Sequence, residues 1–388
     1  MLFRYFQLSV LLSIGLVSCN STENRSKALK EMEFVKVDSL VFDELQILNV
    51  LDYHREQDVY LMVTKGVEGR YFIINSQGEV LAEELLSEGP NAFGMVLHRA
   101  GFVGDEIMFV SDQEIFVYDL DLQQLRKFPF EQHTMVRMIH TPLDNFHQFS
   151  INNVAYGIAN LSDRRLDKFP MNYFDTLNYF HLVNPKDGTV IKGGKIDESS
   201  IFKQNYFYPG KHKPIYFSDL NSKVMSLILP ADSILFQYDQ NLNLVNKIKL
   251  EREEPDQLAK VPMEMADRNE FGAIGLDFAL GGGFTHIVGQ GDAFIVEYKA
   301  GLAPEDNIET DDYKERMALM ETRKIYYYPI EDGILIGLPV LWDKPGNLKL
   351  GLGKNRYLHY ADQADIHEEE KEYQCYYIYE LRPVEEED

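Results

Sequence analysis

The sequence has few cysteines, few cations and almost no long apolar segments, and each shortage excludes a class of protein. Its 388 residues include only Cys19 and Cys375, so the chain is not a disulfide-rich scaffold. Lysine and arginine number 38 against 62 acidic residues, and a formal net charge of -24 repels the nucleic acid backbone. The apolar run from Leu8 to Val17 is too short for a permanent membrane span.

What is present is typical of a folded protein, because 45% of the residues are hydrophobic and 26% are charged. The length is sufficient for a large core. Cys375 lies within the apolar stretch YQCYYIYEL, which favours a buried, inert thiol.

The N-terminus has the shape of an export signal. Arg4 precedes the apolar run, and Leu16-Val17-Ser18-Cys19 resembles the lipobox of bacterial lipoproteins, in which the cysteine receives lipid. The sequence therefore predicts a signal peptide over residues 1–18, lipidation of Cys19 and a polar tether over residues 19–30. The resemblance implies a bacterial envelope protein, anchored to the outer membrane and facing the periplasm, with the cell surface as the alternative.

A near-duplication marks the organisation of the remaining chain. Ile115–Phe128 reads IFVYDLDLQQLRKF and Leu235–Ile248 reads LFQYDQNLNLVNKI. In both, alternating apolar residues flank a turn rich in aspartate and asparagine, whose short side chains bond to nearby backbone groups. This pattern predicts a β-hairpin.

Looser copies of this hairpin recur about every sixty residues along the chain. The positions that mark them are Asn75, Asp119, Asn184, Asp239, Pro329 and Glu380. Repeats that each hold several short strands are typical of propeller blades, so we predict an all-β, six-bladed β-propeller over residues 31–388 as a single domain.

Seven blades are the alternative, because the interval before Pro329 contains an additional strand pair at residues 285–298. The early strand Glu33–Phe42 is expected to pair with the last blade and close the ring, which removes open sheet edges. Helical periodicity is confined to Asp311–Lys324.

With its lipobox and irregular hairpin repeats, the chain resembles the six-bladed β-propeller lipoproteins of Bacteroidetes-type bacteria, including the uncharacterised DUF4221 group. Those proteins often carry a G-x-G-P-x-x-F turn after the first hairpin. Ser87–Phe93 matches it except that Ser87 replaces the first glycine. The resemblance implies a fold and a location, but no catalytic residues.

No motif reaches a catalytic signature. Asp239–Asn243 looks like the start of a calcium loop, but Leu244 stands where glycine is required, so a hairpin turn explains it better. Gly346–Asn355 has the wrong glycine spacing for a phosphate loop. There is no nucleophile elbow and no histidine pair with metal spacing, so we predict no catalytic residue, metal or cofactor. Paired carboxylates could meet across blades, but 62 acids give no basis for choosing two.

Binding residues are easier to suggest. The only tryptophan, Trp342, stands beside Asp343 in a Pro-Gly turn, and an exposed indole would stack on a sugar or peptide, although a blade core is its commoner place. Tyr206 and Tyr208 belong to a basic, aromatic segment that could contact an acidic glycan, and a solvated loop is the alternative. His286 lies in a glycine-rich stretch, where packing near the axis is the alternative.

These observations favour a lipid-anchored binding module that is not an enzyme. Its expected partners are the membrane, through the lipid, and a glycan, a peptide or an envelope protein, but no nucleic acid. The alternatives are an envelope enzyme acting on glycans, either a hydrolase or a lyase, and a structural subunit of an envelope complex.

Overall fold

The computed structural model describes most of the chain. The described residues are 29–42, 46–64, 69–93, 99–111, 114–129, 144–159, 169–254, 258–268, 270, 281–303, 312–360 and 373–385. The predicted signal peptide and Cys19 lie outside them.

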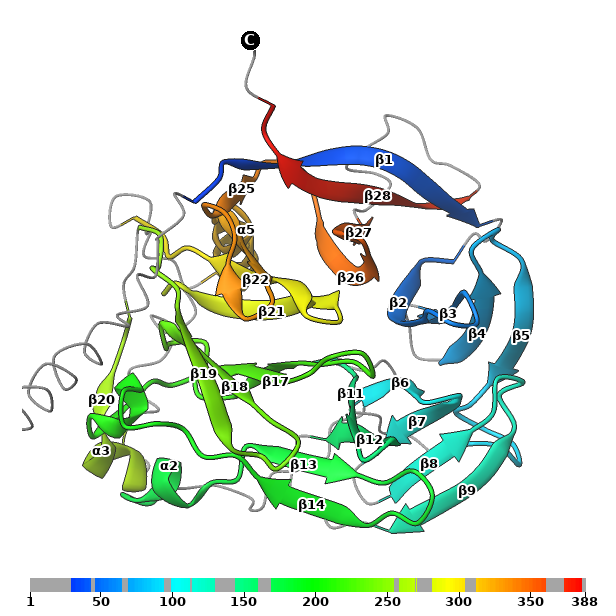
Figure 1. Ribbon diagram of the computed structural model, residues 1–388, viewed down its shortest axis with the longest axis horizontal. Helices are drawn as coiled ribbons and strands as arrows, with labels where there is room; N and C mark the ends of the chain where they lie inside the picture. Colours follow the sequence, from blue (N-terminus) through cyan, green and yellow to red (C-terminus); the bar gives the residue numbers. More distant parts are fainter. Residues whose placement is uncertain are drawn as a thin grey trace, which may run out of the picture.

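Most of the described strands form six sheets arranged around a central axis (Figure 1). The sheets are antiparallel, except that the short strand β10 (Asp144–Asn145) pairs parallel with β6 in blade 2. Apart from β10, the strands of the first three blades run in chain order from the axis to the rim. Blade 1 contains β2 (Leu48–His54), β3 (Val59–Thr64), β4 (Arg70–Asn75) and β5 (Val80–Leu85); blade 2 contains β6 (Arg99–Val103), β7 (Glu106–Val110), β8 (Glu114–Tyr118) and β9 (Gln124–Pro129); blade 3 contains β11 (His147–Ile151), β12 (Val154–Ala159), β13 (Phe180–Val183) and β14 (Val190–Gly193).

The other three blades complete the ring, which confirms the prediction of six rather than seven. Blade 4 contains β16 (Ile215–Phe217), β17 (Met225–Ile228), β18 (Ile234–Tyr238) and β19 (Leu244–Lys249); blade 5 contains β21 (Gly283–Gln290), β22 (Ala293–Lys299) and β23 (Ile325–Glu331), with β24 (Ile334–Leu335) and β25 (Val340–Trp342) both paired to β23; blade 6 contains β26 (Asn347–Gly353), β27 (Arg356–Tyr360), β28 (Gln374–Pro383) and β1 (Met32–Phe42). The additional strand pair that had suggested a seventh blade is β21 and β22 of blade 5.

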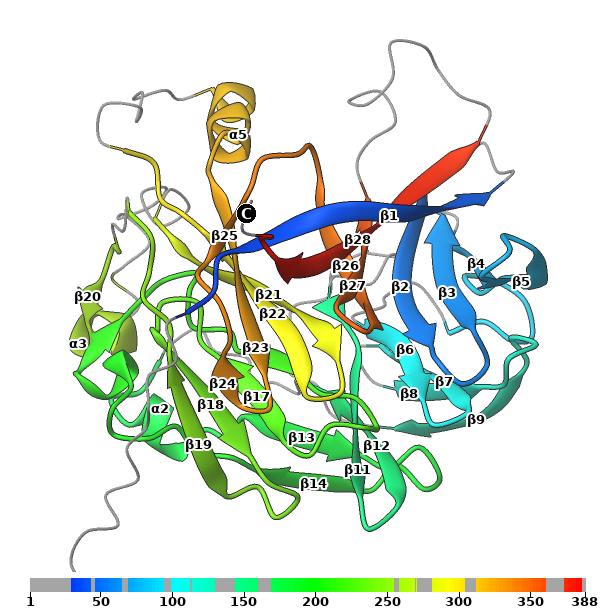
Figure 2. The ribbon, with the colours of Figure 1, turned by 45° about the horizontal axis from the view of Figure 1, so that its top comes forward.

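The ring is closed by strands from both ends of the described chain. β1 pairs antiparallel with β28, from Met32 opposite Pro383 to Phe42 opposite Gln374, with one bulge between Lys36 and Asp38. The two strands lie side by side at the rim (Figure 2). The predicted closure is thus confirmed, and it joins the N-terminal strand to the last blade by a full ladder of hydrogen bonds.

The duplicated hairpins have the same geometry. In the β8–β9 turn, Oδ1 of Asp119 accepts hydrogen bonds from the backbone N–H groups of Asp121 (3.0 Å) and Gln123 (2.8 Å). In the β18–β19 turn, Asp239 accepts the equivalent pair at 2.9 Å each. Leu122 and Leu242 both take positive φ angles, of 57° and 61°. The repeated letters therefore encode a repeated Asx turn.

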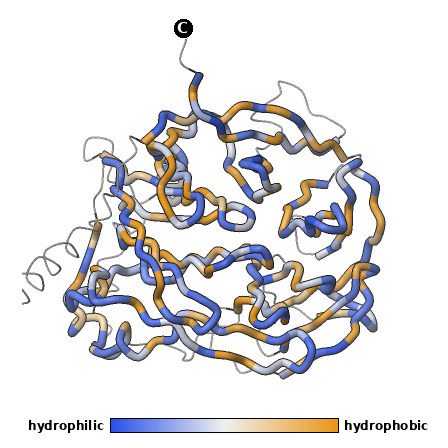
Figure 3. The backbone as a smooth tube through the Cα atoms, viewed as in Figure 1, coloured by the Kyte–Doolittle hydropathy of each residue, from blue (hydrophilic) through white to orange (hydrophobic). Residues whose placement is uncertain are grey.

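Hydrophobic residues fill the space between neighbouring blades, and hydrophobic and hydrophilic stretches alternate all round the ring (Figure 3). Between blades 1 and 2, for example, Phe93 stacks on Phe109 with ring centroids 5.4 Å apart, and Tyr71 meets both rings edge-on. Phe93 ends the Ser87–Phe93 turn, so this turn places an aromatic wedge between two blades. Cys375 on β28 carries a buried thiol, and burial raises its pKa.

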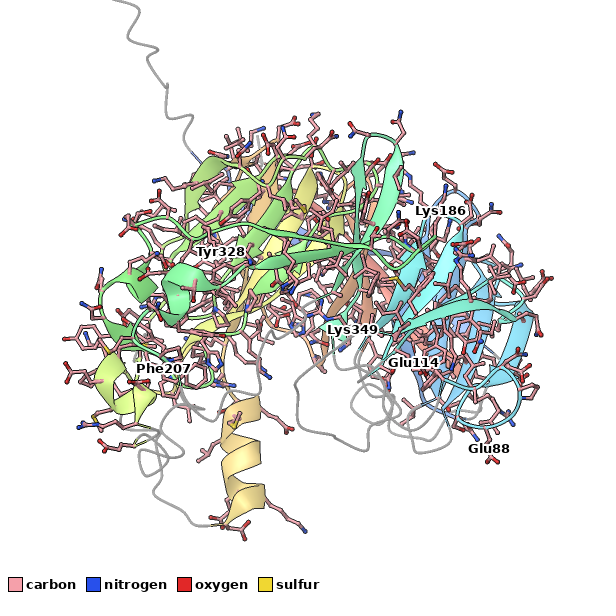
Figure 4. The ribbon with its side chains drawn as sticks, turned by 90° about the horizontal axis from the view of Figure 1, so that it is seen from below. Glu88, Glu114, Lys186, Phe207, Tyr328 and Lys349 are labelled. Atoms are coloured by element: carbon pink, nitrogen blue, oxygen red, sulfur yellow. The ribbon has the colours of Figure 1, made fainter. Side chains whose placement is uncertain are left out.

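Short elements decorate the ring. They are β10 (Asp144–Asn145), α2 (Tyr173–Thr176), the 3-10 helix η1 (Ile201–Lys203), β15 (Tyr206–Phe207), β20 (Val261–Pro262), α3 (Met263–Asp267) and α5 (Tyr313–Glu321). β15 pairs with β20 to form a small sheet beside blade 4. α5 falls within the predicted helical segment and projects away from the disc (Figures 2 and 4). None of the helices in the described part of the chain has the length and apolar character needed to span a bilayer.

Candidate binding site at the propeller axis

Every blade contributes to a pocket at the axis. The pocket has a volume of about 110 Å³ and is lined by residues from the inner strands and from the turns beside them. One lining residue from each blade, in order, is Asp52, Gly104, Gln148, Ser218, Gln290 and Lys349. Figure 4 shows Lys349 near the middle of the molecule. The site is therefore a consequence of ring closure, since no two of these residues are neighbours in the sequence.

Asp52 is aimed at this pocket by an irregularity in β2. The register of β2 against β3 shifts between Val50 and Asp52, and such a bulge re-aims a side chain. The Asp52 carboxylate accepts hydrogen bonds from the backbone N–H of Tyr53 and of Phe102 in blade 2, both at 2.8 Å. Burial raises the pKa of Asp52 to about 7, against these two hydrogen bonds and with a small contribution from the charge of Asp219.

Asp219 performs the equivalent task between blades 4 and 5. Its Oδ2 accepts a hydrogen bond from the N–H of Gly291 at 2.6 Å, and its Oδ1 accepts one from the N–H of Asn221 at 2.8 Å. Ser222 also donates to Oδ1, at 3.2 Å. Both axial aspartates thus tie one blade to the next through backbone hydrogen bonds.

Two further contacts continue the connection around the axis. Gln148 Oε1 accepts from the N–H of Gly104 at 2.8 Å, which joins blade 3 to blade 2. Ser218 Oγ donates to the carbonyl of Gln148 at 2.7 Å, which joins blade 4 to blade 3. These side chains hold the inner strands in place as well as lining the pocket.

Glycines allow the inner strands to approach. A Cβ on Gly351 of β26 would lie 2.3 Å from the backbone of Gly289 of β21, and one on Gly101 would lie 2.7 Å from Oδ2 of Asp52. No side chain could occupy either place without a backbone shift. Close approach of two inner strands therefore explains why position 289 is a glycine. This agrees with the packing interpretation of the glycine-rich stretch that contains His286.

His54 at the pocket wall is held in one tautomer. Its Nδ1 accepts from the N–H of Gln57 at 3.2 Å, so Nε2 carries the hydrogen and donates to the carbonyl of Gly104 at 3.0 Å. The ring is buried and meets Phe102 edge-on. This arrangement suits a structural role for the ring.

One lining group remains available for a ligand. Gln290 Oε1 is buried and has no hydrogen-bond partner within the described residues. A buried acceptor without a donor is costly, so a donor from a ligand or water would be favourable there. The absence of a side chain at Gly353 leaves space next to Gln290 Oε1. A Cβ on Gly353 would lie 2.1 Å from this oxygen and 3.8 Å from the guanidinium carbon of Arg55. Arg55 and Gln290 therefore lie on the same side of the pocket.

The residues proposed from the sequence lie elsewhere; none of Trp342, Asp343, Tyr206, Tyr208 and His286 lines this pocket. Trp342 is 5% exposed and donates its indole N–H to the carbonyl of Gly346 at 3.0 Å. The hypothesis of an exposed stacking indole is therefore corrected: Trp342 belongs to the core between blades 5 and 6, where aromatic neighbours surround it. Asp343 is exposed and pairs with Lys344 at 2.7 Å, which lowers the pKa of its carboxyl.

The two tyrosines pack beside blade 4. Tyr208 is buried, whereas Tyr206 is half-buried with the ammonium of Lys260 4.2 Å from its ring centroid. The segment Phe202–Pro214 is therefore mainly a packing element, because Phe202 and Phe207 are also buried in the same cluster.

His286 is half-exposed on β21 and lies 3.2 Å from Oε1 of Glu297. Glu297 is buried and also accepts hydrogen bonds from Thr285 (2.5 Å) and Tyr327 (2.9 Å). Burial opposes ionisation of Glu297, but these hydrogen bonds and the charge of His286 outweigh it and lower its pKa to about 2. The pair stabilises blade 5 rather than facing the axis.

Within the described residues, no group of three or more His, Cys, Asp or Glu side chains is placed to hold a metal ion. Sequence reasoning did not identify Asp52, Asp219 or Gln290. Each is a polar residue in or just after an inner strand, and only the closed ring shows that these positions converge.

Comparison with solved structures supports the fold. A DUF4221 family member from Bacteroides vulgatus superposes with a TM-score of 0.63 at 11% identity, covering 92% of this chain and 100% of its own. A candidate exported protein from Bacteroides fragilis gives a TM-score of 0.52 at 10% identity, covering 94% of this chain and 98% of its own. No family model and no curated protein matches the chain.

The likeness to the DUF4221 group thus holds at the level of the six-bladed fold. A ring with an axial pocket fits a binding or interaction module.

Proposed function

We propose that this protein is a lipid-anchored binding module of the bacterial cell envelope, and that its axial pocket takes a small polar group of a glycan or peptide. The observation that carries the proposal is the convergence of polar side chains from all six blades on one pocket. Concave sites with a few placed polar groups are the usual form of a small-molecule site.

The chemistry of the lining favours a ligand that both donates and accepts hydrogen bonds. Gln290 offers an unsatisfied acceptor, and Arg55 offers guanidinium donors beside it. Acidic Asp105 and Glu56 also line the pocket, so the mixed charge suits hydroxyl or amide groups better than a strongly charged one. A volume of about 110 Å³ admits one such group rather than a whole oligomer.

The proposed tether joins the ring at Lys30. Lys30 forms a bridge to Gly337, and its carbonyl accepts from the N–H of Leu338, at the outer edge of the ring. Lys30 lies eleven positions after Cys19, so a lipid on Cys19 would hold the ring within about 40 Å of the membrane. The export description of one structural neighbour agrees with this location.

The pocket is tested by ligand-observed NMR and thermal shift with glucose, N-acetylglucosamine and diglycine as probes. We expect at least one probe to bind the wild type and to bind Gln290→Ala about tenfold more weakly, a loss equivalent to one hydrogen bond of about 1.4 kcal/mol. Gln240→Ala, at an exposed position in the outer turn of blade 4, is the matched control. Failure of all three probes, or equal binding by Gln290→Ala, would refute the pocket.

The anchor is tested by expressing the full chain with an alkyne fatty acid and partitioning the cells in detergent. We expect the wild type to carry the label and enter the detergent phase, and Cys19→Ser to do neither. A wild-type protein that stays unlabelled in the aqueous phase would contradict lipidation while leaving the pocket untouched.

A glycan-cleaving enzyme is the second candidate, because Asp52 with its pKa of about 7 lies in the same pocket as Asp219. Their oxygens, however, already accept backbone hydrogen bonds between blades. Release of reducing sugar from envelope polysaccharide by the wild type, but not by Asp52→Asn, would establish this alternative.

A further inference from the structure

Side chains at the end of β2 reach the axial pocket from opposite faces of the strand. Asp52 and His54 are directed toward blade 2, because both side chains hydrogen-bond to its backbone. Side chains alternate along a strand, so Tyr53 and Arg55 are directed toward blade 6 instead. Tyr53 belongs to the apolar cluster between blades 1 and 6, and both residues line the pocket. A second set of lining groups therefore lies on the side of the pocket that faces blade 6.

Tyr53 offers one face of its aromatic ring to this side of the pocket. The opposite face packs on the ring of Tyr60, with the centroids 4.7 Å apart and the planes inclined by 30°. Tyr60 is buried and does not line the pocket, so the lining face of Tyr53 is the one turned away from it. The Tyr53 hydroxyl donates to Asp58 at 2.9 Å, and burial raises its pKa to about 12, so the phenol stays neutral. The ring is thus held in place before a ligand arrives.

Arg55 reaches across blade 6 toward Gln290 of blade 5. The Cβ position of Gly353 in blade 6 lies 3.8 Å from the guanidinium carbon of Arg55 and 2.1 Å from Oε1 of Gln290. A donor from blade 1 and an acceptor from blade 5 therefore approach the same point. Among the described residues, Arg55 has no ion-pair partner and Oε1 of Gln290 has no donor. Both groups are thus available to one ligand.

These three groups favour a particular arrangement of ligand atoms. Two adjacent hydroxyls on a ring can accept a hydrogen bond from a guanidinium and donate one to an amide oxygen at the same time. A pyranose sugar carries such a pair beside a face of C–H groups, which the negative face of an aromatic ring attracts. A peptide amide is trans and directs its N–H and C=O in opposite directions, so it could satisfy only one of the two polar groups.

The charges around the pocket favour a neutral ligand. Four acidic side chains and two lysine or arginine side chains line it, and these are Asp52, Glu56, Asp105, Asp219, Arg55 and Lys349. An anionic sugar would gain one contact with Arg55 but would be repelled by the more numerous carboxylates and by the net charge of -24. A neutral sugar gains the hydrogen bonds without this repulsion.

We propose that Tyr53, Arg55 and Gln290 form a site for one neutral pyranose residue, whose ring stacks on Tyr53 and whose adjacent hydroxyls bond to Arg55 and Gln290. This inference rests on the proposed function of the axial pocket and narrows its ligand from a glycan or peptide to a sugar. The pocket volume of about 110 Å³ limits the site to a single sugar residue.

Ligand-observed NMR with the full chain tests the ligand class. The probes are glucose, trans-1,2-cyclohexanediol, cyclohexanol, diglycine and acetamide. We expect glucose and the diol to bind, and the diol to bind about tenfold more tightly than cyclohexanol, which lacks the second hydroxyl. Tighter binding of diglycine or acetamide than of glucose would overturn the sugar site and leave the pocket standing. Binding of none of the five would refute the pocket and the sugar site together.

Stacking on Tyr53 has its own NMR signature, because an aromatic ring shifts the C–H protons above its face upfield. We expect bound glucose to show such shifts with the wild type and with Tyr53→Phe, which keeps the ring and loses only the hydrogen bond to Asp58. Tyr53→Leu should abolish the shifts and bind glucose about tenfold more weakly. Bound glucose without upfield shifts in the wild type would refute the stacked geometry.

Arg55→Met tests the polar contact without disturbing the core, because Arg55 is exposed. We expect it to melt like the wild type and to bind glucose about tenfold more weakly. Arg70→Met is the matched control: Arg70 lies on β4 of the same blade, pairs with Glu83 at 3.2 Å and does not line the pocket. Arg70→Met should bind glucose normally. Equal affinities of the two variants for glucose would overturn the proposal.

Discussion

The outer hairpins and the inner strands of this ring differ in how they use their sequence. The outer hairpins of blades 2 and 4 repeat the same letters and the same Asx turn, and their last strands, β9 and β19, are largely exposed. The inner strands share almost no letters, and each blade supplies its own residues to the axis, from the inner strand or from the turn beside it. The outer turns therefore repeat one structural motif, whereas the residues at the axis differ from blade to blade.

This difference follows from what each position touches. An outer turn contacts mainly water and its own backbone, so any sequence that forms the Asx turn is sufficient. An inner strand packs against the inner strands of two other blades, so each position must suit a particular neighbour. Mutations at the axis should therefore cost more than matched mutations at the rim.

The largest expected effect is that of Gly351→Ala. The new Cβ would lie 2.3 Å from the backbone of Gly289, and backbone cannot rotate away as a side chain could. We expect a loss of about 3 kcal/mol in the free energy of unfolding, measured by urea denaturation. Gly89→Ala, where nothing lies within 4 Å but φ is +99°, should cost about 1 kcal/mol. If both variants lost the same free energy of unfolding, close packing at the axis would not be what makes Gly351 sensitive.

Two aspartates provide the next comparison. Asp219→Ala removes the acceptor for Gly291 of the next blade, and charged hydrogen bonds of this kind contribute about 2 kcal/mol. Asp239→Ala removes only a local turn contact at the rim and should cost about 1 kcal/mol. Urea midpoints of the two variants decide the order, and a larger loss at Asp239 would reverse the interpretation.

The same regions should respond oppositely to pH. The folded pKa of Asp52, about 7, lies above its ordinary value of 3.8, so its contribution to stability is fully present below about pH 4 and lost as the pH rises through 7. Backbone hydrogen bonds lower the pKa of Asp239, so its contribution is present above the ordinary value and lost on acidification.

Denaturation between pH 2 and pH 8 tests this contrast. The stability of wild type relative to Asp52→Asn should fall as the pH rises from 4 to 7, and that relative to Asp239→Asn should fall only as the pH drops below about 4. Parallel curves for the two variants would show that the axis does not shift the Asp52 carboxyl.

The smallest expected effect is the loss of one tyrosine hydroxyl, which can be measured in each of the two copies of the hairpin. Tyr118 donates to the carbonyl of Asn91 at 2.5 Å and Tyr238 to that of Lys195 at 2.8 Å. Each Tyr→Phe variant should therefore lose about 1 kcal/mol. Losses that differ by more than a factor of two would show that the copies are not equivalent in the folded ring.

Much of the scaffold could be predicted because its signals are local. The six turn markers fall in the third strand of a blade or in the turn after it, and the closing strand pairs with the last blade as expected. Trp342 shows where local reasoning is insufficient: the charged turn that follows it, beginning at Asp343, suggested an exposed indole, but its neighbours in space are Phe34, Tyr327 and Tyr379.

The sequence alone determined the strand pattern, the repeat and the acidity, because alternation, turn chemistry and charge are properties of neighbouring residues. Only the tertiary structure decided which side chains meet at the axis. Asp52 and Asp219 are 167 positions apart in the chain, and closing the ring is what brings them into one pocket.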